Sequence, residues 1–402
     1  MAEVYLHVGL PKTGTTTIQQ ALTAHADGLA AAGVLFPGGR HLVQRQAVYD
    51  LLGQRIPGEG LQVAGSFDWF VAEVRAFGGD KVLVSEEGLA RARPRHVRRL
   101  LTALDRHRVF VVVTIRDLPG LLASAWQQSV MTGGVTPWPE FVSCVRNPAH
   151  GSANVSASFW LKHDVGRVLD VWGPAVPAKR ILLVTVPPPG SPPGVLLDRF
   201  GQAVGVPAAT WSRGVRPRNV GLGLVETEVV RRLNGHLGGA LPTMQYRRMV
   251  EDGLRSHWVA ASSRPPVLPP GDLAWALERS RRVAAELAAR GHPVFGDLAE
   301  LVPTLEQGEL SAPDTPTDLD LLAATEAALA ALATSYGSLV ARHRRLVRSG
   351  VAPGPRGVAT PRSVVENWVF VLKRAALGLA DRSDLVARAA RRYARPSRFG
   401  DP

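Results

Sequence analysis

Short apolar runs alternate with segments of helical periodicity along the first half of the chain. Four strands are predicted by the apolar runs at 3–8, 81–84, 108–115 and 180–186. Apolar positions three and four residues apart predict helices at 16–32, 42–52, 67–77, 97–104, 119–131 and 158–171. The run RVFVVVTI at 108–115 has no alternation of polar and apolar residues, which is typical of the buried centre of a parallel sheet. The pattern predicts a three-layer α/β fold with a central parallel sheet.

The second half of the chain is mainly helical in its pattern. After a proline-rich break, helices are predicted at 195–204, 222–237, 272–289 and 318–348. Residues 350–361 have the glycine and proline content of a linker, and Ser363 with Glu366 forms a capping box before a last apolar stretch. We expect three parts: an α/β domain over 1–300 with its core in 1–240, a helical extension over 301–348, and a linker with a basic helical tail over 349–402.

The stretch YLHVGLPKTGTTT at 5–17 joins the first predicted strand to the first predicted helix. Glycines permit a tight turn there, and the free N–H groups and dipole of a helix start attract an anion. Lys12 adds a full positive charge, and the threonine hydroxyls add hydrogen-bond donors. The sequence therefore predicts a site for a phosphate-like group at Pro11, Lys12, Thr13, Gly14, Thr15 and Thr16. The alternative is a glycine turn with a solvated lysine.

The spacing of this loop departs from the Walker A motif, in which lysine directly follows the second glycine. Here Lys12 lies two residues before Gly14, which argues against an ordinary nucleoside triphosphatase. The order PKTGTT after an N-terminal strand resembles the 5′-phosphosulfate loop of sulfotransferases that use 3′-phosphoadenosine 5′-phosphosulfate (PAPS). The resemblance implies a P-loop-like fold with PAPS as co-substrate. It also implies that Lys12 holds the phosphosulfate and stabilises the leaving phosphate oxygen.

A second candidate motif follows the strand at 108–115. Arg116 ends this strand, and Ser124 comes eight residues later on the next predicted helix. Open parallel sheets bind ligands beyond the carboxyl ends of their strands, where Arg116 and the Lys12 loop are both expected. The Arg116…Ser124 spacing, with Trp126 soon after, is similar to the 3′-phosphate motif of PAPS-dependent sulfotransferases. An Arg116–Asp117 pair with a purely structural role is the alternative.

Two carboxylates follow the strand at 81–84. Sulfuryl transfer to an alcohol requires a base near the acceptor hydroxyl. Several sulfotransferases that act on sugars use a glutamate as this base, and the resemblance implies the same role for Glu87 or Glu86. Glu87 is the match when the chain is aligned with the family on Ser85. A solvated carboxylate pair is the alternative. His7 is expected in the core rather than in the site, and His163-Asp164 is set aside because both are predicted on one helix.

Composition adds expectations about partners and location. The net charge of the chain is +13, but residues 341–402 carry fourteen Arg/Lys against four Asp/Glu, so the preceding residues hold only +3. This distribution argues against nucleic acid as a partner and indicates that the tail could contact an anionic membrane, with packing on the α/β domain as the alternative. The chain has one cysteine, no apolar run long enough to span a membrane and no signal-peptide pattern, so we expect a cytoplasmic protein.

The resemblance leads to an expected function with two alternatives. A bacterial PAPS-dependent sulfotransferase would act on a hydroxyl of a carbohydrate, a glycolipid or a similar small-molecule acceptor. No metal is expected, because a sulfuryl group carries less charge than the phosphoryl group of kinases. The arginines at 213, 216 and 218 could close over the nucleotide or be solvated. A P-loop nucleotide kinase or hydrolase, and a non-catalytic nucleotide-binding module with a basic docking tail, are the alternatives.

Overall fold

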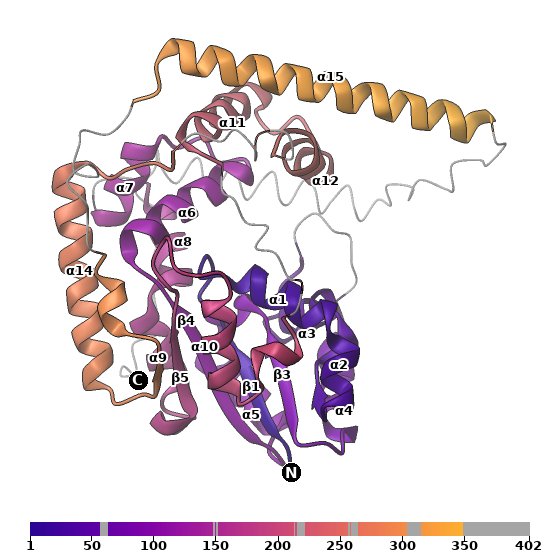
Figure 1. The fold of residues 1–402 in the computed structure, drawn as a ribbon, viewed down its shortest axis with the longest axis vertical. Coiled ribbons are helices and arrows are strands. Elements are labelled where there is room, and N and C mark those ends of the chain that lie inside the picture. The colour runs from indigo at the N-terminus through magenta and orange to yellow at the C-terminus, as the bar shows by residue number, and fades with distance from the viewer. Residues whose placement is uncertain are drawn as a thin grey trace.

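The computed structural model describes residues 1–56, 63–147, 149, 152–212, 214, 222–255, 258, 264–303 and 315–348. Within these residues six strands form one all-parallel sheet in the order β2-β3-β1-β4-β5-β6 (Figure 1). The strands are β1 (Glu3–His7), β2 (Val34–Leu35), β3 (Lys81–Ser85), β4 (Arg108–Ile115), β5 (Ile181–Thr185) and β6 (Val294–Phe295). The predicted α/β fold with a central parallel sheet is confirmed.

The strand order places the carboxyl end of β1 between two neighbours that come from different parts of the chain. The chain builds β2 and β3 on one side of β1 and then returns to build β4 on its other side. Tyr5 of β1 lies opposite Leu83 of β3 and Phe110 of β4. In open α/β sheets, a crevice for ligands forms at such a reversal, outside the carboxyl ends of the strands.

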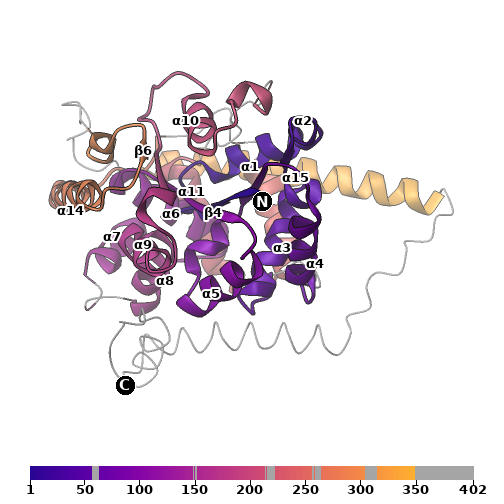
Figure 2. The same ribbon diagram turned by 90° about the horizontal axis from the view of Figure 1, so that it is seen from below.

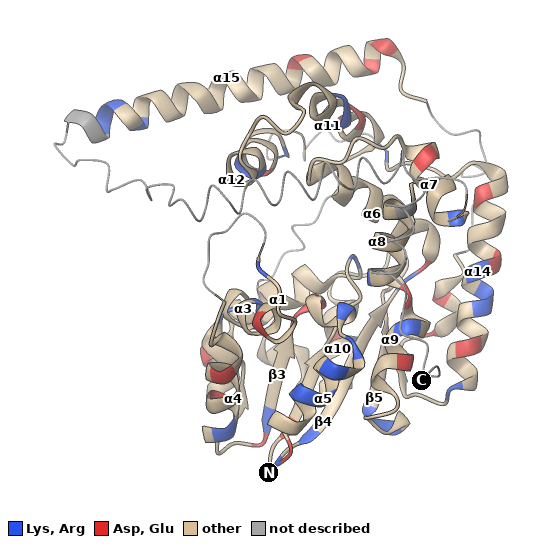
Figure 3. Ribbon diagram, turned by 180° about the vertical axis from the view of Figure 1, so that it is seen from behind, with Lys and Arg blue, Asp and Glu red and all other residues tan. Residues whose placement is uncertain are grey.

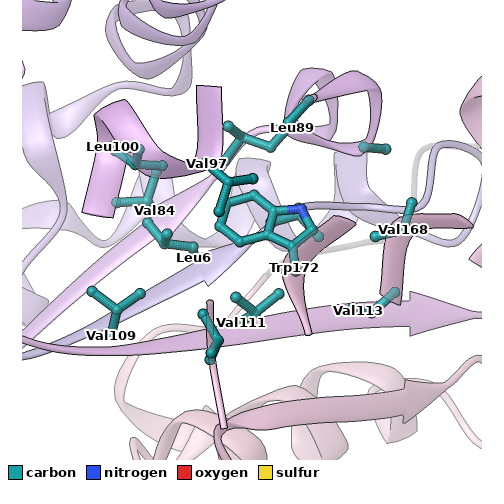
Figure 4. Close-up of a cluster of buried hydrophobic side chains, with 14 of the residues drawn as sticks. Leu6, Val84, Leu89, Val97, Leu100, Val109, Val111, Val113, Val168 and Trp172 are labelled. Carbon is teal, nitrogen blue, oxygen red and sulfur yellow. The ribbon is translucent and has the colours of Figure 1, made fainter. Parts of the chain in front are cut away.

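Helices cover both faces of the sheet (Figure 2). One face is covered by α1 (Thr15–Ala24), α2 (Ala26–Ala31) and α10 (Val195–Val204), and the other by α3 (His41–Leu51), α4 (Ser66–Ala76), α5 (Pro94–Ala103) and α9 (Val165–Trp172). Successive side chains of a strand point to opposite faces, so β4 serves both cores. Val111 packs with Trp172 on the second face (Figure 4), while Val112 packs with the helices of the first face.

A third apolar cluster holds the helical part of the described chain together. It joins α6 (Leu118–Met131), α7 (Trp138–Arg146), α11 (Leu224–Leu237) and α14 (Pro270–Ala289) with parts of α8 (Ala153–His163), of the π-helical segment η5 (Arg248–Arg255) and of α15 (Asp318–Arg348). The short helix α12 (Thr243–Arg247) leads directly into η5. In Figure 1, α15 lies across the helices at the end of the molecule farthest from the N-terminus. The α15 helix spans the whole range that its periodicity predicts.

Two predicted helices are each divided in the structure. The segment 16–32 forms α1 and α2, which meet at His25, and 158–171 contributes to α8 and α9, which meet at Asp164. The Asp164 side chain accepts a hydrogen bond from the N–H of Arg167, so it caps the start of α9. Apolar periodicity does not reveal this interruption, because both helices bury residues of similar spacing.

Two strands were not predicted from the sequence, and several predictions concern residues that the structure does not describe. Strands β2 and β6 were not predicted, because two-residue strands carry no periodicity. The division of the chain into three parts stays a prediction, and the residues at 213, 216 and 218 and the tail at 349–402 lie outside the described residues. No described helix is both long and apolar enough to cross a membrane.

Candidate functional site

The loop between β1 and α1 has the backbone of an anion site. Gly9 and Gly14 have φ values of 105° and 83°, in the left-handed region that favours glycine, and Lys12 between them has a φ of 67°. No side chain caps the start of α1. The N–H groups of Thr15 and Thr16 have no recorded acceptor among the described residues, so they remain available to an anion.

A chain of buried polar side chains holds this loop on the sheet. The Thr13 hydroxyl lies 2.5 Å from both the carbonyl oxygen of Leu10 and the hydroxyl of Thr114. His7 joins the ends of three strands, because its Nε2 lies 3.1 Å from Thr114 Oγ1 and its Nδ1 lies 2.8 Å from Ser85 Oγ. Burial lowers the pKa of His7 to about 3, so its ring is neutral.

These buried hydrogen bonds limit the roles that His7 and Thr13 can have in the site. His7 is buried and structural, as expected for a histidine in the core. Thr13 is also fully buried, and its hydroxyl faces the sheet rather than the loop's open side. Any contact of Thr13 with an anion therefore comes from its backbone N–H.

The side chain of Lys12 extends from the loop to α6, the helix that follows β4. Its Nζ donates a hydrogen bond of 3.3 Å to Oε1 of Gln128 on α6. Burial lowers the pKa of Lys12, the carboxylate of Glu87 opposes that shift, and the charges of Arg255 and Arg116 add to it. A bound anion would stabilise the charged ammonium, so this environment favours an anionic ligand.

Glu87 lies against the start of α1. It opens the 3₁₀ segment η2 (Glu87–Arg91) after β3, and its Oε2 accepts a hydrogen bond from the hydroxyl of Thr15. Burial raises the pKa of Glu87 and the neighbouring charge of Glu86 raises it further, against the lowering effects of the Thr15 hydrogen bond, Lys12 and His41. A carboxylate with a raised pKa beside a hydroxyl group is suited to accept a proton.

Glu86 has a different environment from its neighbour. Its side chain is buried, with Oε2 2.6 Å from Nε2 of His41 and Oε1 accepting a 3.0 Å hydrogen bond from the N–H of Gly88. It therefore caps η2 and anchors the start of α3. Of the two carboxylates, Glu87 is the one that lies at the Lys12 loop.

Arg116 extends from the end of β4 to the same loop. Its Nη1 lies 3.5 Å from the carbonyl oxygen of Lys12, and its Nε and Nη2 lie 3.3 and 3.2 Å from Oδ2 of Asp117. Gly120 leaves room for the guanidinium, since a Cβ there would lie 2.0 Å from Arg116 Nη2. The pairing with Asp117 supports the structural alternative, while the contact with Lys12 brings Arg116 to the predicted site.

Ser124 lies on the face of α6 that is turned to the loop. Residues four apart share one face of a helix, and Gln128, four residues after Ser124, contacts Lys12. The Ser124 side chain is half-exposed and takes part in none of the hydrogen bonds recorded among the described residues. Trp126 points elsewhere: its ring is buried in the helical cluster and its Nε1 donates to the carbonyl oxygen of Thr136. Trp126 therefore belongs to the helical cluster and does not face the Lys12 loop.

The end of α8 brings further residues that sequence reasoning missed. His163 interacts with the backbone of Pro11, and burial lowers the pKa of His163 to about 3, with the charges of Lys162 and Lys12 acting in the same direction. Lys162 precedes it, and burial and the charge of Arg91 lower the pKa of Lys162. The pair at 163 and 164 was visible in the sequence, but the predicted single helix hid the break that turns His163 to the loop.

A cavity of about 50 Å³ adjoins this group of residues. Arg116 and His163 line it together with Leu10, and Arg279 contributes a guanidinium that lies 4.4 Å from the ring centroid of Trp160. The Nδ1 atom of His163 is buried and has no hydrogen-bond partner among the described residues. On the side of β4 and α8 the site therefore carries the guanidinium groups of Arg116 and Arg279 with the carboxylate of Asp164, and on the side of β3 it carries the carboxylate of Glu87.

Metal ligands and relatives give no further assignment. Within the described part of the chain, no group of three or more His, Cys, Asp or Glu residues is placed to hold a metal ion. Comparisons of the whole chain with protein-family models, with curated proteins and with solved structures found no match.

Proposed function

We propose that this protein transfers a sulfuryl group from PAPS to a hydroxyl group of a carbohydrate, a glycolipid or a similar acceptor. The observation that carries the proposal is the convergence of Lys12, Arg116 and Glu87 at the carboxyl ends of β1, β4 and β3. These strands are adjacent in the sheet, although the residues are far apart in the sequence. One nucleotide can contact all three side chains at such an edge.

In the proposed complex, each group has a separate task. The N–H groups at the start of α1 and the Lys12 ammonium bind the 5′-phosphosulfate, and Arg116 with the Ser124 hydroxyl binds the 3′-phosphate. Guanidinium groups suit a phosphate because they donate two parallel hydrogen bonds. The resemblance of the PKTGTT loop and of the Arg116…Ser124 spacing to PAPS-dependent sulfotransferases supports this division.

The chemical step is a displacement at sulfur. The acceptor oxygen forms a bond to sulfur while the bond between sulfur and the bridging phosphate oxygen breaks, and adenosine 3′,5′-bisphosphate leaves. Glu87 takes the proton of the acceptor hydroxyl, which its raised pKa favours. Lys12 stabilises the negative charge that develops on the bridging oxygen. Glu86 supports the fold of η2 and takes no part in the step.

A binding experiment tests the nucleotide part of this proposal. Isothermal titration of the full chain with adenosine 3′,5′-bisphosphate is expected to show tighter binding than titration with 5′-AMP or with ATP and magnesium. Arg116→Ala is expected to weaken the binding about tenfold or more, since a charge-assisted hydrogen bond is typically ~1.5–3 kcal/mol. Arg146→Ala is the matched control, because Arg146 is half-exposed and pairs with Asp272 on α14. Equal affinity for the three nucleotides would contradict the proposal.

A transfer experiment separates the proposal from its alternatives. The protein is incubated with radiolabelled PAPS and a panel of glycan and glycolipid acceptors, and labelled products are counted. Phosphate release from ATP and magnesium would indicate the nucleotide kinase or hydrolase instead. Binding of adenosine 3′,5′-bisphosphate without transfer to any acceptor would favour the non-catalytic module.

A further inference from the structure

The helix α15 is longer than the other described helices, and neighbouring elements cover only part of its surface. It spans Asp318–Arg348, which corresponds to about 46 Å at 1.5 Å per residue. Leu321 and Ala328 on one face are buried in the helical cluster, where α15 packs on α11 and η5. The remaining faces are exposed along most of the helix.

An apolar stripe runs along one of the exposed faces. Leu322, Leu329 and Tyr336 are seven residues apart, and their exposed fractions are 55, 62 and 70%. Leu339 follows three residues after Tyr336 and is 63% exposed, whereas Leu332 packs on the helical cluster and lies outside this stripe. Apolar residues at positions a and d of a seven-residue repeat form the seam of a two-helix coiled coil. We call Leu322, Leu329, Tyr336 and Leu339 the α15 seam.

The charges of α15 are divided between its two ends (Figure 3). Residues 318–328 contain Asp318, Asp320 and Glu326 and no basic residue. Residues 338–348 contain four arginines, of which Arg342, Arg344 and Arg345 are exposed, and no acidic residue. A second copy of α15 can therefore match these charges only if it runs in the opposite direction.

We propose that two copies of this chain pair through the α15 seam, with the two α15 helices antiparallel about a two-fold axis. Such a contact is isologous, so one exposed surface supplies both sides of the interface. It covers the seam of each copy and places the acidic start of one helix beside the arginines of the other. A parallel pair would place like charges together at both ends.

The chain's own tail is a poorer occupant of the seam. Residues 349–402 carry ten Arg/Lys against four Asp/Glu, and this positive charge opposes docking beside the arginines that end α15. A membrane surface is also disfavoured, because Asp318 and Glu326 border the apolar residues at the other end of the helix. Complementary charge thus favours a second copy.

Sedimentation velocity of the full chain at micromolar concentrations tests the pairing. The wild-type protein is expected to sediment as a dimer, and Leu329→Lys and Tyr336→Lys as monomers, since each places two charges in the closed seam. Ala327→Lys is the matched control, because Ala327 is exposed on the same helix outside the seam, and it is expected to remain a dimer. A monomeric wild-type protein, or a dimer that both seam variants leave intact, would overturn the proposal.

Charge exchange tests the antiparallel direction. Asp318→Lys with Glu326→Lys, and separately Arg342→Glu with Arg344→Glu, are each expected to raise the dissociation constant of the dimer about tenfold. The protein with all four substitutions is expected to return toward the wild-type constant. Failure of the combined variant to recover would overturn the antiparallel pairing, provided that circular dichroism shows equal helix content in the three variants.

Discussion

Arg116 Nη1 lies 3.5 Å from the carbonyl oxygen of Lys12, although 104 residues separate the two in the sequence. The contact exists because β1 and β4 are neighbouring parallel strands, so the loops that follow them meet at one edge. The guanidinium of Arg116 therefore lies at the backbone of the loop that carries Lys12. This relationship underlies the proposed binding of a nucleotide with phosphates at two positions.

The first prediction concerns Lys12. Lys12→Ala is expected to lower the rate of sulfuryl transfer by about 10²–10³-fold, because it removes the charge that stabilises the leaving oxygen. The fold is expected to persist, since the loop is held by Thr13 and Thr114 rather than by Lys12. Lys179→Ala is the control, because Lys179 is exposed before the amino end of β5. Full activity of Lys12→Ala in a transfer assay would refute the mechanism.

A second prediction follows from the pKa of Glu87, which burial raises. In the unfolded chain Glu87 loses its proton at a lower pH than in the folded protein, so its ionisation opposes folding as pH rises above the unfolded pKa. Glu87→Gln is therefore expected to unfold at a higher temperature than the wild type at neutral pH, with the difference vanishing in acid. The same variant is expected to lose transfer activity. Thermal melts and transfer assays at several pH values measure both effects.

Glu86→Gln provides the contrast to this behaviour. Glu86 is buried between His41 and the N–H of Gly88, so a neutral amide weakens both contacts. Lower stability with largely retained transfer activity is expected, with a cost of about 1–3 kcal/mol for a disturbed buried hydrogen bond. A Glu86→Gln protein that is as stable as the wild type but inactive would assign the base to Glu86 instead.

A third prediction concerns the hydrogen bond from Thr15 to Glu87. This bond stabilises the carboxylate, so its removal raises the pKa of Glu87 further. In Thr15→Val, the acid limb of the pH–rate profile is expected to move to higher pH. Thr102→Val is the control, because Thr102 is exposed on α5 and is not among the residues of the site. An unmoved limb in Thr15→Val would mean that Glu87 does not control the rate.

Some of this site could be predicted from the sequence. The glycines at 9 and 14, the lysine between them and the arginine after the clearest strand are local signals, and parallel strands place them at one edge without further information. The roles of Glu86 and Glu87 could not be predicted, because they depend on the turn of η2 and on His41, which comes from another segment. The burial of Trp126 could not be predicted either, since sequence spacing does not show which face of α6 is buried.

The contribution of α8 to the site also could not be predicted from the sequence. Its last turn reaches Pro11 only because Asp164 ends one helix and caps the next. A single continuous helix over the same residues would satisfy the same apolar periodicity. The strand at 108–115 was easier, because six of its eight residues are buried between two helical layers and the run consists mostly of apolar residues without alternation.

The last prediction uses Gly120 to test the position of Arg116 without changing Arg116 itself. A Cβ at residue 120 would lie 2.0 Å from Arg116 Nη2, so Gly120→Ala displaces the guanidinium from its contacts with Asp117 and Lys12. Alanine favours a helix over glycine by about 1 kcal/mol, so the variant is expected to be no less stable than the wild type. Its affinity for adenosine 3′,5′-bisphosphate is expected to fall toward that of Arg116→Ala. Gly235→Ala on α11 is the control, because a Cβ there meets no atom within 4 Å. Wild-type affinity in Gly120→Ala would show that Arg116 binds the nucleotide from another position, or not at all.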